Sequence, residues 1–206
     1  MIEVQNAIKT FDGNQVLKNV SAIFEAGKTN LIIGQSGSGK TVLMKSIVGI
    51  HRIDSGHILY DGRDITIMKR KQLNQLRREI GMLFQGSALF DSMTVLENVR
   101  FPLDMFSDET EDEKDRRARF CLERVELSHA VDLYPSEISG GMQKRAAIAR
   151  AIVLNPKYLF CDEPNSGLDP KTSLLIDKLI QDITHEFNIT TIINTHDMNS
   201  VMEIGE

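Results

Sequence analysis

The sequence contains little cysteine, no long hydrophobic run and no excess of positive charge, and each absence argues against a class of protein. Its two cysteines, Cys121 and Cys161, do not form a C-x-x-C pair. This argues against a disulfide-stabilised scaffold and a structural zinc site, and it favours a reducing compartment. Residues 1–4 lack a basic stretch followed by an apolar core, so we expect no signal peptide. Because no apolar run reaches about 18 residues, we also expect no membrane-spanning helix.

The charge balance is acidic, since 24 lysines and arginines stand against 29 aspartates and glutamates, for a formal net charge of -5. Such a chain is a poor candidate for a protein that mainly neutralises nucleic-acid phosphates. The basic residues at 69–71 and 77–78 are not interleaved with aromatic residues, so they are interpreted as a solvated helix face. We therefore expect no nucleic-acid partner. The length of 206 residues predicts one domain, or one domain with an insertion.

The order of strand and helix signals predicts an α/β protein with a helical insertion. Apolar runs between turn residues predict strands at 2–8, 16–24, 29–33, 57–60, 80–84, 157–161 and 190–194. Helices are expected at 40–48, 69–79, 141–154 and 171–186, and the charged run 108–119 opens another. The strand at 29–33 is apolar on both faces, which predicts a buried parallel strand. Strand signals are absent between about residues 86 and 155, so we interpret that segment as the insertion.

A glycine-rich loop between a predicted strand and a predicted helix matches the pattern G-x-x-x-x-G-K-[ST]. Glycines let such a backbone curl so that successive N–H groups face phosphate oxygens, and the following helix adds its N-terminal dipole. The lysine reaches the β- and γ-phosphates, and the threonine offers a hydroxyl to Mg²⁺. The loop consists of Gly34, Gln35, Ser36, Gly37, Ser38, Gly39, Lys40 and Thr41. It predicts a nucleoside triphosphate site.

Two acidic residues follow the apolar strand at 157–161. A strand end beside a phosphate loop is where a metal-holding carboxylate is needed, so Asp162 is a candidate for binding Mg²⁺ through water. Glu163 is a candidate for polarising an attacking water. The alternative, a structural strand that ends in a polar turn, is disfavoured by the presence of the phosphate loop. Cys161, immediately before them, is interpreted as a small core residue.

A second helix start with anion-binding character lies at 139–143, inside the insertion. Ser139 is a natural N-cap, and Gly140 and Gly141 would let a backbone approach an anion closely. A helix that is merely capped is the alternative interpretation. This helix start is far along the chain from the first phosphate loop. We therefore favour the interpretation that it is a second helix N-terminus that binds phosphate.

Taken together, these motifs resemble the nucleotide-binding subunit of an ABC transporter, over the whole chain and in order. The loop at 34–41 resembles Walker A, residues 158–163 resemble Walker B, and residues 139–143 resemble the signature motif. The resemblance assigns further residues: Gln85 in the Q-loop, Asp169 in the D-loop at 166–169, His196 as the switch histidine, and Phe11 as the aromatic that stacks on adenine.

The resemblance implies a fold, cofactors and partners. The fold would be a RecA-like P-loop NTPase core (1–85 and 156–206) with an N-terminal antiparallel β subdomain and an inserted α-helical signature subdomain (86–155). Two copies would bind two ATP molecules with Mg²⁺ head to tail, each site joining Walker A of one copy to Ser139 and Gly141 of the other. His196 would contact the γ-phosphate, and Gln85 the metal and the attacking water. An integral membrane permease would hold the subunit at the cytoplasmic face of the inner membrane.

A finer resemblance concerns the cargo. Residues 82–90, 93–99 and 101–103, together with Met142, resemble the ATPase of bacterial lipid-trafficking systems that work with MCE-domain proteins. This implies a phospholipid or another hydrophobic cargo, and a permease contact around 86–103. The alternatives are the ATPase of a different ABC importer or exporter, a soluble ABC ATPase of DNA repair or translation, and a GTPase. The last is disfavoured because the sequence has no N-K-x-D motif.

Two features depart from the family pattern. Ile138 replaces the usual leucine before the signature serine, which is a conservative change. The family normally continues with further strands and a helix beyond the position of Glu206, so we expect the single ABC ATP-binding domain at 1–206 to be truncated at its C-terminus.

Overall fold

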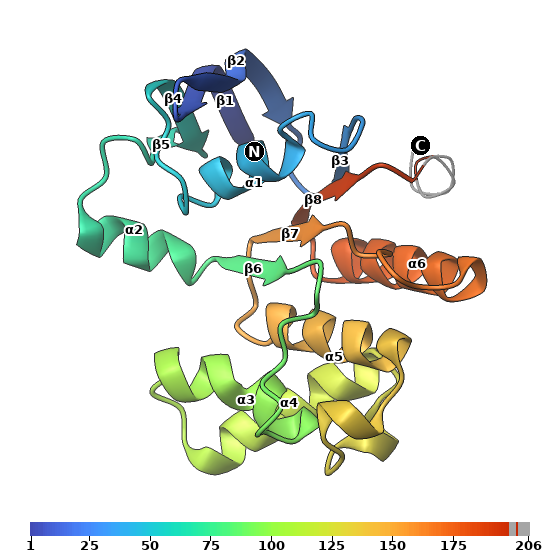
Figure 1. Ribbon diagram of the computed structural model, residues 1–206. Coiled ribbons are helices and arrows are strands. Elements are labelled where there is room, and N and C mark those ends of the chain that lie inside the picture. The colour runs from blue at the N-terminus through green and yellow to red at the C-terminus, as the bar shows by residue number, and fades with distance from the viewer. Residues whose placement is uncertain (198–200, 202–206) are drawn as a thin grey trace.

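The computed structural model describes residues 1–197 and residue 201, and it places two sheets above a group of helices (Figure 1). The strands are β1 (Ile2–Phe11), β2 (Asn14–Phe24), β3 (Thr29–Ile33), β4 (Ser55–Tyr60), β5 (Arg63–Asp64), β6 (Ile80–Leu83), β7 (Tyr158–Asp162) and β8 (Thr190–Thr195). The α-helices are α1 (Lys40–Ile47), α2 (Arg70–Arg77), α3 (Val95–Phe106), α4 (Glu111–Arg124), α5 (Gly140–Ile152) and α6 (Pro170–Glu186). Two short 3-10 helices, η1 (Ser128–Ala130) and η2 (Pro135–Glu137), precede α5. The predicted α/β fold class is confirmed.

The N-terminal sheet is antiparallel, with the strand order β2-β1-β4-β5. The hairpin between β1 and β2 is closed by Asp12 and Gly13, which have φ angles of 47° and 80°. Positive φ at both central residues is the requirement of the tight turn that matches the twist of hairpin strands. The Asp-Gly pair therefore explains locally why the chain reverses at this point, two strands before the phosphate loop.

The second sheet is parallel, with the strand order β3-β8-β7-β6. Its strands β7 and β8 are buried along their whole length, because each has a strand on both sides. The strand β3 is only partly buried, and Ile33 is 49% exposed. The expectation of a buried strand at 29–33 is therefore wrong for the described part of the chain, in which β3 pairs with β8 alone and forms the sheet edge.

Helices α3, α4 and α5 lie together on the far side of β6 from the antiparallel sheet (Figure 1). Thr94 caps the N-terminus of α3: its Oγ1 accepts a hydrogen bond from the Glu97 amide at 3.2 Å, and Glu97 accepts one from the Thr94 amide at 2.7 Å. The alanine-rich helix α5 packs against β6 so closely that a Cβ at Gly81 would lie 2.2 Å from the carbonyl oxygen of Ala151. Glycine at 81 thus permits the contact that joins the helices to the sheet.

The prediction that Cys161 is a core residue is confirmed, since it is fully buried. Cys121 is fully buried as well, and both cysteines are free thiols. Burial raises the pKa of the Cys161 thiol and raises that of Cys121 to about 11, which keeps both thiols protonated near neutral pH. Among the described residues, no helix is both long and apolar enough to cross a bilayer. The part of the expected core beyond residue 197, Val201 apart, lies outside the described residues.

Candidate functional site

The glycine-rich loop connects the carboxyl end of β3 to the first residue of α1. Lys40 is 8% exposed, and its Nζ donates hydrogen bonds to the carbonyl oxygens of Gly34 at 2.8 Å and Gln35 at 3.0 Å. The loop therefore curls around its own lysine. Gly39 has a φ of 95°, and a Cβ there would lie 3.1 Å from Val16 Cγ1 of β2. Both the backbone conformation and the close packing on β2 favour glycine at this position.

A hydroxyl, a carboxylate and a carboxamide meet beside this loop. Thr41, in the first turn of α1, donates from Oγ1 to Asp162 Oδ1 at 3.2 Å. The Asn194 amide donates from Nδ2 to the same Asp162 oxygen at 2.6 Å and to Thr41 Oγ1 at 3.2 Å. The three residues converge because parallel strands present their carboxyl ends at one edge, and Asp162 of β7 is directly paired with Asn194 of β8. The sequence did not identify Asn194 as a site residue. The one feature that could have indicated it is that Asn194 is a polar residue at the end of an apolar strand.

A second cluster forms around Glu163. His196 Nδ1 lies 3.0 Å from Glu163 Oε1, and Gln85 Nε2 donates to Glu163 Oε2 at 3.3 Å. Glu163 has a φ of 48°, an uncommon conformation for a residue with a side chain. That turn in the backbone directs the carboxylate away from the path of β7, toward Gln85 and His196. The structure thus brings together all three residues predicted to be catalytic, from positions 85, 163 and 196 of the chain.

The segment that carries Gln85 is held by two cations of helix α5. Lys144 is 4% exposed and its Nζ donates to the carbonyl oxygen of Gln85. The guanidinium of Arg150 donates to the carbonyl oxygens of Ser87 and Ala88, each at 2.7 Å. Burial lowers the pKa of both cations, and each is satisfied by carbonyl oxygens rather than by a carboxylate. Sequence reasoning missed this anchoring, because it joins α5 to a loop about 60 residues away.

The N-terminus of α5, at residues 139–141, lines a groove to which none of residues 34–41 contributes. Ser139 caps α5, accepting a hydrogen bond from the Met142 amide at 3.3 Å, so the predicted N-cap is confirmed. Asp169 caps α6 and accepts from the Lys171 and Thr172 amides, each at 3.1 Å. The side-chain hydroxyl and amide of Thr172 hold the pKa of the Asp169 carboxyl below its usual value. Gly140 and Gly141 join Ser139 and Asp169 in lining a groove of about 820 Å³.

Phe11 lies at the end of β1, in the hairpin whose second strand packs on Gly39. The ring is 36% exposed and has the His51 ring 5.4 Å away in an edge-on arrangement, with Lys9 Nζ 5.1 Å from its centroid. The structure therefore places Phe11 on the side of the molecule that carries the glycine loop. A role in stacking on adenine stays a prediction.

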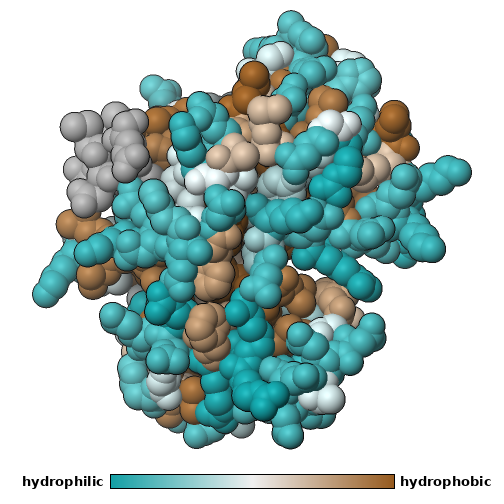
Figure 2. All heavy atoms as spheres, turned by 180° about the vertical axis from the view of Figure 1, so that it is seen from behind, coloured by the Kyte–Doolittle hydropathy of each residue, from teal (hydrophilic) through white to brown (hydrophobic). Residues whose placement is uncertain are grey.

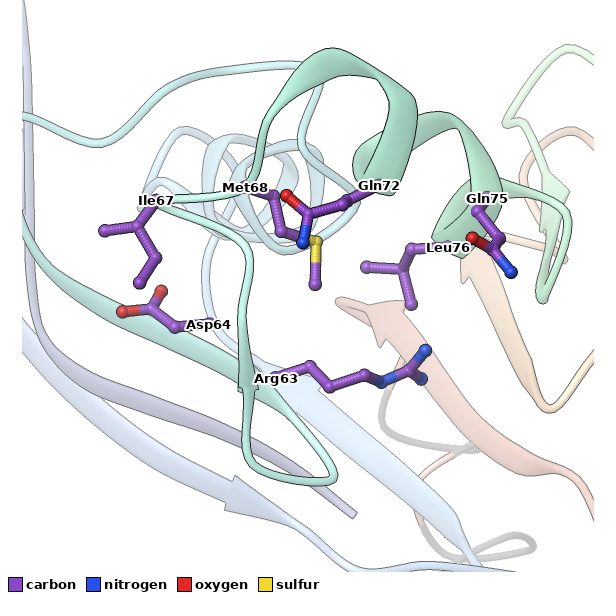
Figure 3. Close-up of a pocket in the computed structure, with 7 residues that line it drawn as sticks. All are labelled: Arg63, Asp64, Ile67, Met68, Gln72, Gln75 and Leu76. Carbon is purple, nitrogen blue, oxygen red and sulfur yellow. The ribbon is translucent and has the colours of Figure 1, made fainter.

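A separate cavity of about 410 Å³ lies between β5 and α2, and Figure 3 shows Met68 and Leu76 pointing toward it. Its charged groups already have protein partners. Arg63 forms a two-pronged ion pair with Glu79, with both N–O distances at 2.8 Å, and Asp64 accepts from the Thr66 amide at 2.9 Å. This ion pair holds the pKa of the Glu79 carboxyl below its usual value. The cavity thus presents structural ion pairs rather than convergent reactive groups.

The donor set at the glycine loop fits Mg²⁺ bound together with a nucleotide. Thr41 and Asp162 offer hard oxygen ligands 3.2 Å apart, the kind that Mg²⁺ prefers. Among the described residues there is no cluster of three or more histidine, cysteine, aspartate or glutamate side chains that could hold a metal alone.

Two features define the class of phosphate-loop nucleotide-binding proteins. One is a glycine loop that curls around its lysine between a parallel strand and a helix, and the other is a hydroxyl of that helix bonded to a carboxylate at the adjoining strand end. Within that class, the chain belongs to the ABC transporter family, whose family model matches residues 17–166.

Curated relatives match over most of this chain. It is 40% identical over 198 residues to the probable ribonucleotide transport ATP-binding protein mkl of Mycobacterium leprae, covering 96% of this chain and 57% of that protein. It is 44% identical over 207 residues to the methionine import ATP-binding protein MetN of Carboxydothermus hydrogenoformans, covering 99% of this chain and 61% of that protein. The chain therefore spans about three fifths of the length of these relatives.

Solved structures share the fold. The dimeric structure of MJ0796, described as a bacterial ABC transporter cassette, superposes with a TM-score of 0.89 at 33% identity, covering 98% of this chain and 91% of that one. The cbiO1 protein of Clostridium perfringens, described as part of the ABC transporter complex cbiONQ, gives a TM-score of 0.89 at 35% identity, covering 97% and 80%.

Proposed function

We propose that this chain is the ATP-hydrolysing subunit of an ABC transporter. One observation carries the proposal: Gln85, Glu163 and His196 meet in one hydrogen-bonded cluster, while Asp162, next to Glu163, bonds to Thr41 at the end of the glycine loop. Groups for binding phosphate, for holding a cation and for activating water are thereby adjacent. Phosphoryl transfer to water needs these three groups and little else from a protein.

Each residue has a role that follows from its chemistry. The amides of residues 34–39 and the Lys40 ammonium would bind the phosphates, and Thr41 and Asp162 would hold Mg²⁺. The cation, when bound, neutralises negative charge on the β- and γ-phosphates. Glu163 would accept a proton from the attacking water. Gln85 would orient that water, and His196 would contact the γ-phosphate while holding Glu163 through its Nδ1 contact of 3.0 Å.

A second copy of the chain would complete the site. Ser139, Gly140 and Gly141 lie at the N-terminus of α5, where free backbone amides and the helix dipole favour an anion. They line a groove that none of the described residues 34–41 lines, which supports a role on a nucleotide held by another copy. In a head-to-tail dimer they would bind the nucleotide held by the partner's loop, with Asp169 in the same interface.

The permease would dock in a groove of about 710 Å³ between α2 and α3. The face in Figure 2 is hollowed between its upper and lower halves, and hydrophobic side chains border the hollow. Phe84, Phe90 and Phe106 of this groove are 39%, 42% and 49% exposed, while Arg77 and Arg78 lie on its rim. Exposed aromatics beside arginines suit a partner helix, because these residue types dominate interface energetics. Leu89 packs against the helical core instead, so it is not a free anchor.

Replacing Phe90 with serine is expected to weaken copurification of the permease by about 10-fold or more, because an exposed anchor ring would be lost from the groove. Nucleotide binding and melting temperature should stay near wild type. The matched control is Phe120→Ser, which alters a ring that is 39% exposed on α4 and lies outside the groove. Equal permease recovery from both variants would place the docking surface elsewhere.

For the cargo, we propose a phospholipid or another hydrophobic molecule, with an MCE-domain protein as a further partner. The support is the resemblance of residues 82–90, 93–99, 101–103 and Met142 to lipid-trafficking ATPases. Residues 84, 88, 90, 101 and 102 of these segments line the groove proposed for the permease. The names of the two relatives refer instead to ribonucleotide transport and to methionine import. The subunit would then lie at the cytoplasmic face of the inner membrane, held by the permease.

Copurification followed by an ATPase assay tests this proposal. The permease recovered with the chain from its host is kept in detergent micelles without added lipid, and ATP hydrolysis is measured after addition of phospholipid, methionine or a ribonucleotide other than ATP as the candidate cargo. We expect stimulation by phospholipid alone. Stimulation by methionine or ribonucleotides would overturn the lipid cargo and leave the ATPase intact, whereas recovery of a soluble complex without a permease would favour a non-transport ABC ATPase.

A further inference from the structure

Asn194 stands at the centre of the hydrogen bonds that organise the candidate metal site. Its Nδ2 donates to Asp162 Oδ1 at 2.6 Å and to Thr41 Oγ1 at 3.2 Å, so one amide joins the two oxygens that would hold Mg²⁺. Its backbone carbonyl oxygen accepts from the Glu163 amide at 2.9 Å. A single residue of β8 therefore contacts the cation-binding carboxylate, the cation-binding hydroxyl and the backbone of the candidate general base.

The side-chain oxygen of Asn194, Oδ1, accepts no hydrogen bond from the described residues. The residue itself is fully buried. The orientation of the amide is determined by its neighbour, because the Asp162 carboxylate accepts hydrogen bonds and must face the NH₂ group. Buried polar atoms in proteins are normally paired, so leaving Oδ1 unpaired has an energetic cost that the structure accepts while the NH₂ group stays on Asp162 and Thr41.

The sheet register makes this arrangement rigid. Asn194 is paired with Asp162 of β7 on one side and with Ile32 of β3 on the other. Both neighbouring strands thus hold its backbone, and the glycine loop follows β3 directly. An amide held in this way can determine the orientation of the Asp162 carboxylate with little freedom left to the side chains.

We propose that Asn194 is the positioning residue of the cation site: its NH₂ group holds the carboxylate of Asp162 against the hydroxyl of Thr41. This inference rests on the proposed function, since it concerns the same site. Hydrogen bonds to the groups that hold a metal orient those groups and tune metal affinity. Asn194 would then set the cation concentration at which the nucleotide site works.

The test measures cation binding rather than turnover. Mn²⁺ bound in the presence of saturating ADP is counted by electron paramagnetic resonance, and binding of a fluorescent ADP is measured separately in EDTA. For Asn194→Leu, which keeps the size of the side chain, we expect the Mn²⁺ requirement to rise by about 10- to 100-fold. Fluorescent ADP should bind in EDTA as it does to the wild type, because the glycine loop and Lys40 are untouched.

The matched control is Thr191→Val on the same strand, which removes a buried hydroxyl whose Oγ1 lies 2.6 Å from Thr184 Oγ1. Both variants lose a buried hydrogen bond and some thermal stability, but only Asn194→Leu should change the Mn²⁺ requirement. Should that variant not fold, Asn194→Thr carries the same expectation, because one hydroxyl cannot donate to both Asp162 and Thr41.

An unchanged Mn²⁺ requirement in a folded Asn194 variant would overturn the positioning role while leaving the proposed function intact. Equal changes in Thr191→Val would overturn it as well, since they would reveal a general effect of destabilising β8. A wild-type chain that binds no fluorescent ADP under either condition would contradict the proposed function itself, and this inference with it.

Discussion

Replacing Glu163 with glutamine is expected to slow ATP hydrolysis by about 10²- to 10⁴-fold while ATP binding survives, since removal of a general base typically has that effect. Glutamine preserves the size of the side chain, and its one amide oxygen can still accept a hydrogen bond from Gln85 or His196, but it cannot accept a proton from water. The Asp162 and Thr41 oxygens are unchanged, so the cation and the phosphates should still bind. Phosphate release and binding of a fluorescent ATP analogue measure the two properties separately.

The control for this variant is Glu109→Gln, which removes the same charge from an exposed position before α4. It should hydrolyse ATP at the wild-type rate. Turnover of Glu163→Gln within a few-fold of the wild type would assign water activation to another group, and His196 would then be the first candidate because it lies 3.0 Å from the same carboxylate.

Introducing Ser139→Arg into the Glu163→Gln background is expected to abolish the ATP-dependent dimer. Slow hydrolysis lets the dimer accumulate, and the arginine would fill the groove in which Ser139, Gly140 and Gly141 should receive the partner's nucleotide. Nucleotide binding to the 34–41 loop of each copy should persist, because that loop lies elsewhere. Light scattering with and without ATP measures the change in mass.

Loss of the cap is the competing explanation for that result, because removing a serine N-cap costs about 0.5–2 kcal/mol of helix stability. Ser139→Ala removes the cap without adding bulk and should still dimerise with ATP. Ser92→Arg adds the same bulk at an exposed position before α3 and should dimerise as well. A dimer of wild-type affinity in Ser139→Arg would refute the composite site.

The elements that the sequence predicted well are those whose signals are local. The N-cap at Ser139 formed as expected, because it depends on residues a few positions apart. The hairpin at Asp12-Gly13 and the capping box at Thr94 and Glu97 are local in the same way. The strand at 29–33 shows the limit of this reasoning. Its apolar residues indicated burial, but burial depends on how many strands flank it, and in the described chain only β8 does.

The candidate site divides in the same way. Gly34 to Thr41, Asp162 and Glu163 were visible in the sequence because a phosphate loop and an acidic strand end are contiguous patterns. Asn194, Lys144 and Arg150 were not, because each acts on a group from a distant segment. Their contacts with Asp162, Gln85 and Ser87 exist only after the strands are ordered and α5 is packed on β6.

By itself, the sequence determined the class of this protein: the glycine loop, the acidic strand end and the capped signature helix are local arrangements of backbone and side chain that need no fold to be recognised. Only the tertiary structure decided which groups cooperate. The parallel order β3-β8-β7-β6 brings the ends of separate strands to one edge of the sheet. Asn194 is thereby placed in contact with both Thr41 and Asp162, and Glu163 is placed next to Gln85 and His196. The reason is physical: hydrogen bonds act over about 3 Å, and neighbours at that distance in space are chosen by strand order and packing, not by separation along the chain.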